Sequence, residues 1–201
     1  MILEHLGKRP MIDPSARIAP NATICGAVTI GANTSVGFGA VIVAESGPVS
    51  IARDCVIMDT ALIRGTRGNP VGIGNCVMVG PRAYLSGCTV ADEVFLATGA
   101  TVFNGASIGR GAEVRINGLV HLRTRLPEGA TVPINWVAVG DPAQILPPDK
   151  HDEIWAVQKP LDFPRYVFGV DRPPPGGSIM PQVMPRYAGF LRKAHTADRA
   201  V

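Results

Sequence analysis

The chain has 201 residues and a formal charge of +3, and 46% of its residues are apolar. This length corresponds to roughly one domain, and the apolar content excludes a wholly disordered chain. Residues 1–158 carry 12 basic and 13 acidic residues, so the body of the protein is nearly neutral. It therefore offers no basic face for nucleic acid.

The N-terminus and the cysteines predict a cytoplasmic protein that does not enter membranes. Residues 1–8 lack the apolar core of a signal peptide. The uncharged segment 18–44 contains Pro20 and many polar residues, unlike a membrane span. No CxxC spacing is present, so we expect four reduced thiols, with Cys55 and Cys88 at small interior positions.

An aliphatic residue recurs every six positions through most of the chain. The period is lengthened twice, within residues 43–50 and 64–72, and it drops one residue after Leu85. A small residue stands two positions before most of these aliphatic residues, which we call registered, and a glycine often follows them. The registered positions are Ile12, Ile18, Ile24, Ile30, Val36, Ile42, Ile51, Ile57, Ile63, Ile73, Val79, Leu85, Val90, Leu96, Val102, Ile108, Val114, Val120, Leu126 and Val132.

Neither an α-helix nor an ordinary strand has a period of six, whereas hexapeptide repeats are typical of a parallel β-helix. The sequence predicts an all-β fold over residues 12–143, which we take as a left-handed parallel β-helix shaped like a triangular prism. We expect the registered side chains to fill the prism and glycine to take corners that need a positive φ. Segments that interrupt such a solenoid tend to share one face, often the binding face.

The rest of the chain is expected to surround this solenoid. Residues 1–11 form an N-terminal lead. Residues 144–171 hold a short helix capped by Asp149 and an aromatic segment that packs on the prism. A Pro/Gly-rich stretch begins residues 172–201, which we expect to be a linker and a flexible tail.

Four segments of the regular part have the order and spacing of a known family. They are Ile51–Asp59, Gly68–Gly74, Leu85–Val90 with its dropped residue, and Val139–Ala143. The regular part thereby resembles the γ-class carbonic anhydrases and their relatives among the hexapeptide-repeat (isoleucine-patch) acyltransferases. This resemblance implies a homotrimer with the active site between neighbouring prisms.

The resemblance also places the family's metal ligands on this chain. The three zinc-ligand histidines fall on Arg64, Pro81 and Ser86, none of which is a usual zinc ligand. Of the family's polar residues around the site, Asp59 is kept, and Glu45 stands where the family has an aspartate. We therefore expect a lost metal site, no zinc and no CO₂ hydratase activity.

The polar residues that remain predict a pocket for a small anionic or carboxylated metabolite, because arginine offers planar donors that stay charged. A carboxylate beside them could act as a general base. Arg64 has a structural alternative, which is an ion pair with Asp59 or Glu45 that holds the trimer together. The binding candidates are Arg64, Arg67, Asn69, Arg82 and Tyr84, and the base candidates are Asp59 and Glu45.

Three functions stay open at this point, and we favour the first. It is a metabolite-binding protein that needs no cofactor, with or without chemistry of its own. The second is an acyltransferase that uses acyl-CoA as co-substrate, with His121, the one histidine within the repeat, as its catalyst. The third is a non-catalytic trimeric scaffold whose tail docks on a partner. A shifted metal site that uses His121 or Cys76 is a further alternative.

Overall fold

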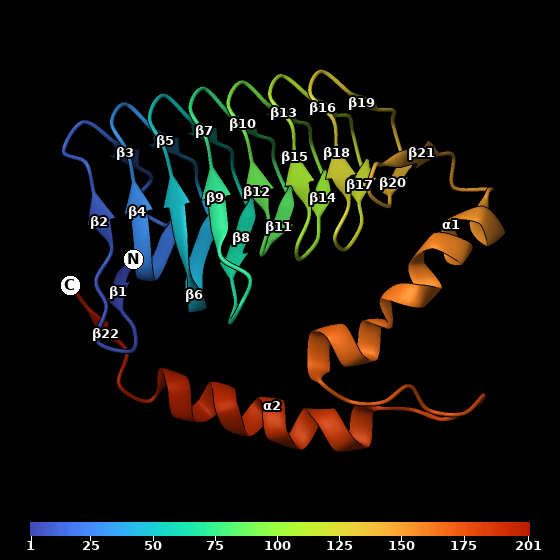
Figure 1. Cartoon of the computed structure of the whole chain (residues 1–201). Coiled ribbons are helices and arrows are strands. Elements are labelled where there is room, and N and C mark those ends of the chain that lie inside the picture. The colour runs from blue at the N-terminus through green and yellow to red at the C-terminus, as the bar shows by residue number, and fades with distance from the viewer.

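The structure is a computed structural model that describes all 201 residues. About eight turns of short parallel strands stack into a solenoid with three faces. A helical C-terminal part leaves the last turn and runs back below the solenoid (Figure 1). The all-β parallel β-helix predicted from the six-residue period is confirmed.

Each face of the prism is a ladder of parallel strands, and β4 (Thr23–Ile30) and β6 (Val41–Ile51) bend around a corner and so belong to two faces. Face A contains β2 (Met11–Ile12), the second halves of β4 and β6, β9 (Val71–Ile73), β12 (Thr89–Val90), β15 (Ser107–Ile108) and β18 (Arg125–Leu126). Face B contains β1 (Ile2–Glu4), the first halves of β4 and β6, β8 (Leu62–Gly65), β11 (Tyr84–Ser86), β14 (Thr101–Val102), β17 (Leu119–Val120) and β20 (Val137–Val139). Face C contains β3 (Arg17–Ile18), β5 (Ser35–Val36), β7 (Val56–Ile57), β10 (Met78–Val79), β13 (Phe95–Leu96), β16 (Glu113–Val114) and β19 (Thr131–Val132).

The registered aliphatic side chains form the core, as expected. All of them are buried except Ile12 and Ile18, which are partly exposed at the N-terminal end of the prism. On face B the pairing sets Ile42 beside Ile63 and Ile63 beside Leu85, so the ladder is apolar along its length. Each such side chain contributes about 1.5–3 kcal/mol of transfer free energy, which makes the repeat itself the main stabilising feature.

The expectation that glycine takes corners with a positive φ is confirmed at one position of the repeat, but the glycines next to the registered residues have another role. The corner glycines with a positive φ are Gly39, Gly99, Gly105, Gly111 and Gly129. The glycines that directly follow a registered residue do not have positive φ; a Cβ at Gly37 would collide with Asp59 of the next turn, and one at Gly74 would collide with Asp92. The left-handed conformation falls three residues after the registered position, where Asn33 and Asp54 adopt it. The glycines next to the registered residues are therefore needed for close approach between turns.

The two segments that lengthen the period lie at the same corner, between faces B and A. Residues 43–50 extend β6 around this corner, and Thr66–Asn69 form a tight turn closed by two backbone hydrogen bonds of 3.0 and 2.9 Å. The helix α2 (Met180–His195) runs back under this side of the prism (Figure 1). The prediction that the interruptions share one side of the solenoid is confirmed.

The C-terminal part begins with β21 (Gln144–Leu146), which pairs antiparallel with β20 and ends the ladder of face B. Next come α1 (His151–Gln158), a 3₁₀ turn at Lys159–Leu161 and a π-helical turn at Pro164–Phe168. The expected cap by Asp149 is wrong, because Lys150 precedes the first turn of α1 and no side chain caps it.

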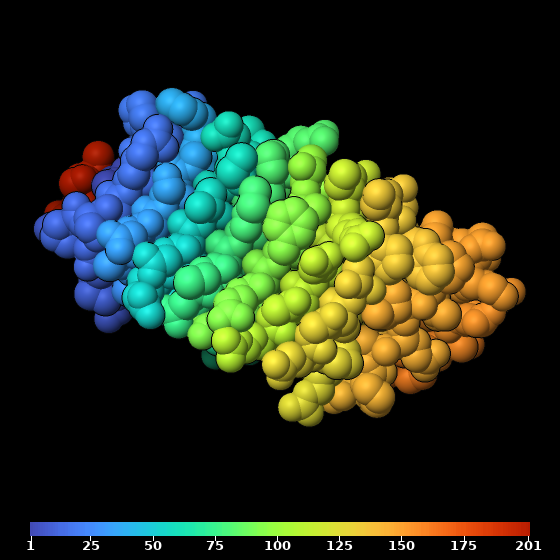
Figure 2. All heavy atoms as spheres, turned by 90° about the horizontal axis from the view of Figure 1, so that it is seen from above, coloured from blue at the N-terminus to red at the C-terminus, as the bar shows by residue number.

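The segment expected to be a flexible tail contains a helix and a strand. After the Pro/Gly-rich stretch, α2 returns along the prism, and β22 (Arg199–Ala200) pairs antiparallel with β1. Val183 and Ala194 are buried on the prism side of α2, at a spacing that a helix places on one face. Figure 2 shows the opposite side of the prism, where the red end of the chain is seen only beside the N-terminal turns.

Candidate functional site

The best-connected polar cluster of the predicted site joins Glu45, Arg64 and Tyr187. Glu45 lies where β6 turns the corner, Arg64 lies in β8, and Tyr187 lies in α2. The Glu45 side chain is only 3% exposed, and its Oε2 lies 3.1 Å from Arg64 Nε. Tyr187 donates its hydroxyl to Glu45 Oε1 at 3.3 Å and accepts from Arg64 Nη1 at 3.4 Å.

Of the two ion-pair partners expected for Arg64, the structure shows Glu45, within one chain. The contact between Nε and Oε2 is an ion pair without the alignment of a hydrogen bond. Burial raises the pKa of Tyr187, and the charge of Glu45 raises it further against the opposing effect of Arg64. The phenol therefore keeps its proton and donates a hydrogen bond to the carboxylate.

Asp59, the other expected partner of Arg64, has a different place in the fold. Its Oδ1 accepts a hydrogen bond of 2.7 Å from the backbone of Phe38, beside Gly37. Asp92 makes the same 2.7 Å contact to the backbone of Asn75 elsewhere in the repeat. Asp59 thus ties one corner of the solenoid to the next, at the end of β8 away from Arg64.

The three positions matched to zinc ligands do not meet within one chain. Ser86 pairs in register with Arg64 on face B, and its side chain is buried. Pro81 lies between β10 and β11 and lines a groove of about 310 Å³ on face C, together with Met78 and Phe95. A site made from all three positions would need the surfaces of two prisms.

The remaining binding candidates are spread over both ends of face B. Arg67 follows β8 and Arg82 precedes β11, and both side chains are exposed. Neither arginine forms an ion pair within the chain. Asn69 accepts a hydrogen bond of 3.1 Å from Tyr166, so the expected packing of the aromatic segment on the prism occurs through this residue. Tyr84 lies between the two arginines in β11.

His121 lies further along the same face, directly after β17. Three ladder steps, through Ser86 and Phe103, separate it from Arg64, which corresponds to about 14 Å at the usual strand spacing. Burial lowers the pKa of His121, its Nδ1 has no partner, and its ring lies 5.9 Å from that of Phe103. The imidazole is therefore neutral and separate from the Glu45 cluster.

The cysteines behave as expected for interior thiols. Cys55 and Cys88 are buried, and burial raises the pKa of Cys88 to about 12. Cys76 is exposed at a corner. Neither Cys76 nor His121 belongs to a group of metal-ligating side chains within the chain, whereas His5, His195 and Asp198 form one.

Tyr187, His5, His195 and Asp198 were not among the sequence candidates. All four lie in the N-terminal lead or in the segment expected to be a tail. A sequence signal existed for α2, since Val183, Tyr187 and Ala194 recur at helical spacing. No spacing in the sequence could have placed His5 beside Asp198, because 193 positions separate them.

Comparison with known proteins identifies the family. No family model matches the chain. The γ-carbonic anhydrase 1 of Arabidopsis thaliana mitochondria is 34% identical over 151 residues, which are 72% of this chain and 53% of that protein. A carbonic anhydrase of Geobacillus kaustophilus is 34% identical over 111 residues, covering 55% of this chain and 61% of that protein. The chain belongs to the γ-carbonic anhydrase-like family of hexapeptide-repeat proteins.

A solved structure supports this assignment at the level of the fold. The hexapeptide transferase family protein from Anaplasma phagocytophilum superposes with a TM-score of 0.52 at 26% identity, covering 80% of this chain and 91% of that one. The γ-carbonic anhydrase-like chain spans about half the length of the curated relatives it matches. None of its helices combines the length and the apolar character needed to cross a membrane.

The ion pair predicts a specific pattern of stability. Arg64→Met should destabilise the protein by about 3 kcal/mol, because it leaves the Glu45 carboxylate buried without a cation. Adding Glu45→Gln should recover most of this loss, since both charges are then absent. Arg110→Met, which breaks an exposed ion pair with Glu93, is the matched control and should cost less than about 1 kcal/mol. Urea denaturation measures all four proteins, and equal effects of the two arginine variants would contradict the cluster's role.

Proposed function

We propose that this γ-carbonic anhydrase-like protein works without a catalytic zinc ion and binds a small anionic or carboxylated metabolite in clefts between subunits. The observation that carries the proposal is the fixed guanidinium of Arg64 at a zinc-ligand position. Glu45 and Tyr187 hold this group in place, and about a third of its side chain, 35%, stays exposed. A permanent cation at this position opposes the binding of a metal ion.

The matched residues do not fit zinc. Zinc sites in proteins use nitrogen, sulfur or carboxylate oxygen ligands. Arg64 carries its own positive charge, Pro81 has no side-chain donor atom, and the Ser86 hydroxyl is a neutral group on a buried side chain. Hydration of CO₂ by a zinc-bound hydroxide therefore has no support from these positions.

The charge around the cleft favours a carboxylate. Glu45 offsets the charge of Arg64, so a bound anion would find its free positive charge at Arg67 and Arg82. These arginines lie at the two ends of face B and supply planar pairs of donors. Tyr84 lies between them and offers a hydroxyl for orientation.

A homotrimer would complete such a cleft. The outward side chains of Val56, Met78 and Phe95 form a column on face C, because their strands pair in register. Val56 and Phe95 are exposed large apolar residues, and Pro81 lines the groove beside this column. An apolar column on a monomer is a favourable surface for association. Contact of this face with face B of another subunit would bring Pro81 toward Arg64.

The absence of zinc chemistry predicts a kinetic result. The protein supplied with zinc should hydrate CO₂ no faster than the buffer blank, measured by stopped-flow with a pH indicator. The triple substitution Arg64→His, Pro81→His and Ser86→His provides the control, because it restores the ligand types that the resemblance assigns. A zinc-dependent rate in the natural protein would contradict the proposal.

The proposed cleft predicts binding of a dicarboxylate such as succinate. Isothermal titration should show binding by the natural protein and at least about tenfold weaker binding by Arg67→Ala or Arg82→Ala, because each removes a charged hydrogen bond. Arg110→Ala, an exposed arginine paired with Glu93, is the control and should bind like the natural protein. Equal affinity in all variants would place the anion elsewhere.

One observation favours acyl transfer as a second candidate function. His121 is neutral, and its buried Nδ1 lacks a partner, which suits a general base. The similarity to the hexapeptide transferase family protein is consistent with this chemistry. The scaffold function has less support, because α2, which belongs to the segment expected to dock on a partner, packs on its own prism through Tyr187.

Acyl transfer predicts a loss on substitution of the base. His121→Ala should lower transfer from acetyl-CoA to an amine or hydroxyl acceptor by about 100-fold or more, since a general base contributes that much. His151→Ala changes an exposed histidine of α1 and serves as the control. Free CoA release measured with a thiol reagent reports the rate. Absence of transfer in the natural protein, or an unchanged rate in His121→Ala, would remove this role.

A further inference from the structure

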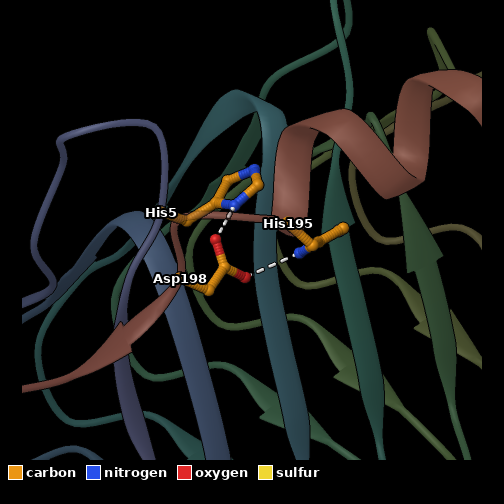
Figure 3. A group of neighbouring side chains, drawn as sticks. All are labelled: His5, His195 and Asp198. Atoms are coloured by element: carbon orange, nitrogen blue, oxygen red, sulfur yellow. Dashed lines mark hydrogen bonds and ion pairs between the residues drawn. The ribbon is translucent and has the colours of Figure 1, made fainter.

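A second polar cluster lies where the two ends of the chain meet (Figure 3). His5 directly follows β1, His195 is the last residue of α2, and Asp198 precedes β22. One ligand atom from each of the three side chains lies within 4.8 Å of the others. The antiparallel pairing of β22 with β1 holds Asp198 beside His5.

The carboxylate of Asp198 bridges the Nδ1 atoms of the two imidazole rings. Its Oδ1 is 2.7 Å from His5 Nδ1, and its Oδ2 is 2.7 Å from His195 Nδ1. The rings stack with their centroids 4.5 Å apart. Each carboxylate oxygen of Asp198 therefore faces a ring nitrogen of one histidine.

The other ring nitrogen of His5 fixes which atom faces the cluster. His5 Nε2 lies 3.0 Å from the backbone carbonyl of Glu45, which can only accept, so Nε2 carries a proton and donates it. His5 is 1% exposed, and its ring cannot turn freely in this position. A histidine that binds a metal through one nitrogen commonly donates the other N–H to a backbone carbonyl. His5 has this arrangement, with Nδ1 directed at Asp198.

We propose that His5 Nδ1, His195 Nδ1 and Asp198 form a binding site for a divalent transition-metal ion such as zinc. Two imidazole nitrogens and one carboxylate are a donor set that zinc prefers, and the ion would replace the protons now shared with Asp198. The side chains of His195 and Asp198 are 38% and 16% exposed, so an ion can reach the site from solvent.

Binding at this site would be coupled to the docking of the C-terminal segment. One ligand comes from residue 5, and the other two come from residues 195 and 198, which reach the first turns only when α2 and β22 are in place. A ligand that binds only the docked form stabilises it by mass action. The site uses none of the positions matched to the family's zinc ligands, and the proposal does not depend on the proposed function.

The test uses the full chain without a histidine tag, freed of metal with a chelator and titrated with zinc against a chromophoric competitor. We expect about one zinc per chain and a rise in melting temperature of roughly 5–10 °C at a hundredfold excess over the dissociation constant. His195→Ala and Asp198→Asn should each weaken zinc binding more than ~100-fold and abolish the thermal shift, because loss of a ligand exceeds loss of a supporting residue.

The controls separate this site from other sources of zinc binding. His151→Ala removes an exposed histidine next to Asp152 and should bind zinc like the natural protein. His195 and Asp198 are preferred to the buried His5 for substitution, because their variants are expected to fold, which circular dichroism verifies. No zinc binding by the natural protein, or equal binding by His195→Ala and Asp198→Asn, would overturn the proposal.

Discussion

The buried carboxylate of Glu45 is the constraint around which the polar structure is arranged. An ionised carboxylate that is 3% exposed is strongly unfavourable unless a cation and hydrogen-bond donors surround it. Arg64 supplies the cation from the neighbouring strand, and Tyr187 supplies a donor from α2. The backbone carbonyl of the same residue accepts from His5, so one position in β6 contacts both polar clusters. The path of the C-terminal segment follows from these contacts.

The solenoid and its site come from different parts of the sequence. The regular turns provide rigid, parallel strands, while the two lengthened segments at one corner supply Glu45, Arg67 and Asn69. This division is common in repeat folds, because added residues leave the stacked core unchanged and collect on one side. It also explains how a family can retain its fold while the chemistry at its site differs between members.

The sequence predicted the fold well because its period reports the core directly. Every registered residue from Ile24 to Val132 is buried, as the six-residue spacing required. Contacts that form only because the C-terminal segment folds back along the prism could not be predicted in this way. Tyr187 and His195 meet the first turns only after α2 has reversed direction, and the prolines and glycines before it indicated a linker instead. For Arg64 the sequence offered two partners, and only the geometry of the corner distinguishes Glu45 from Asp59.

One of the two polar clusters disfavours a metal ion, and the other favours it. Arg64 brings a positive charge to a position matched to a zinc ligand, whereas His5, His195 and Asp198 bring nitrogen and carboxylate donors together at the chain ends. Anomalous diffraction at the zinc absorption edge, from crystals grown with zinc, locates any bound ion directly. We expect a peak between His5, His195 and Asp198 and none beside Arg64 and Ser86. A peak beside Arg64 and Ser86, or none at the chain ends, would contradict this expectation.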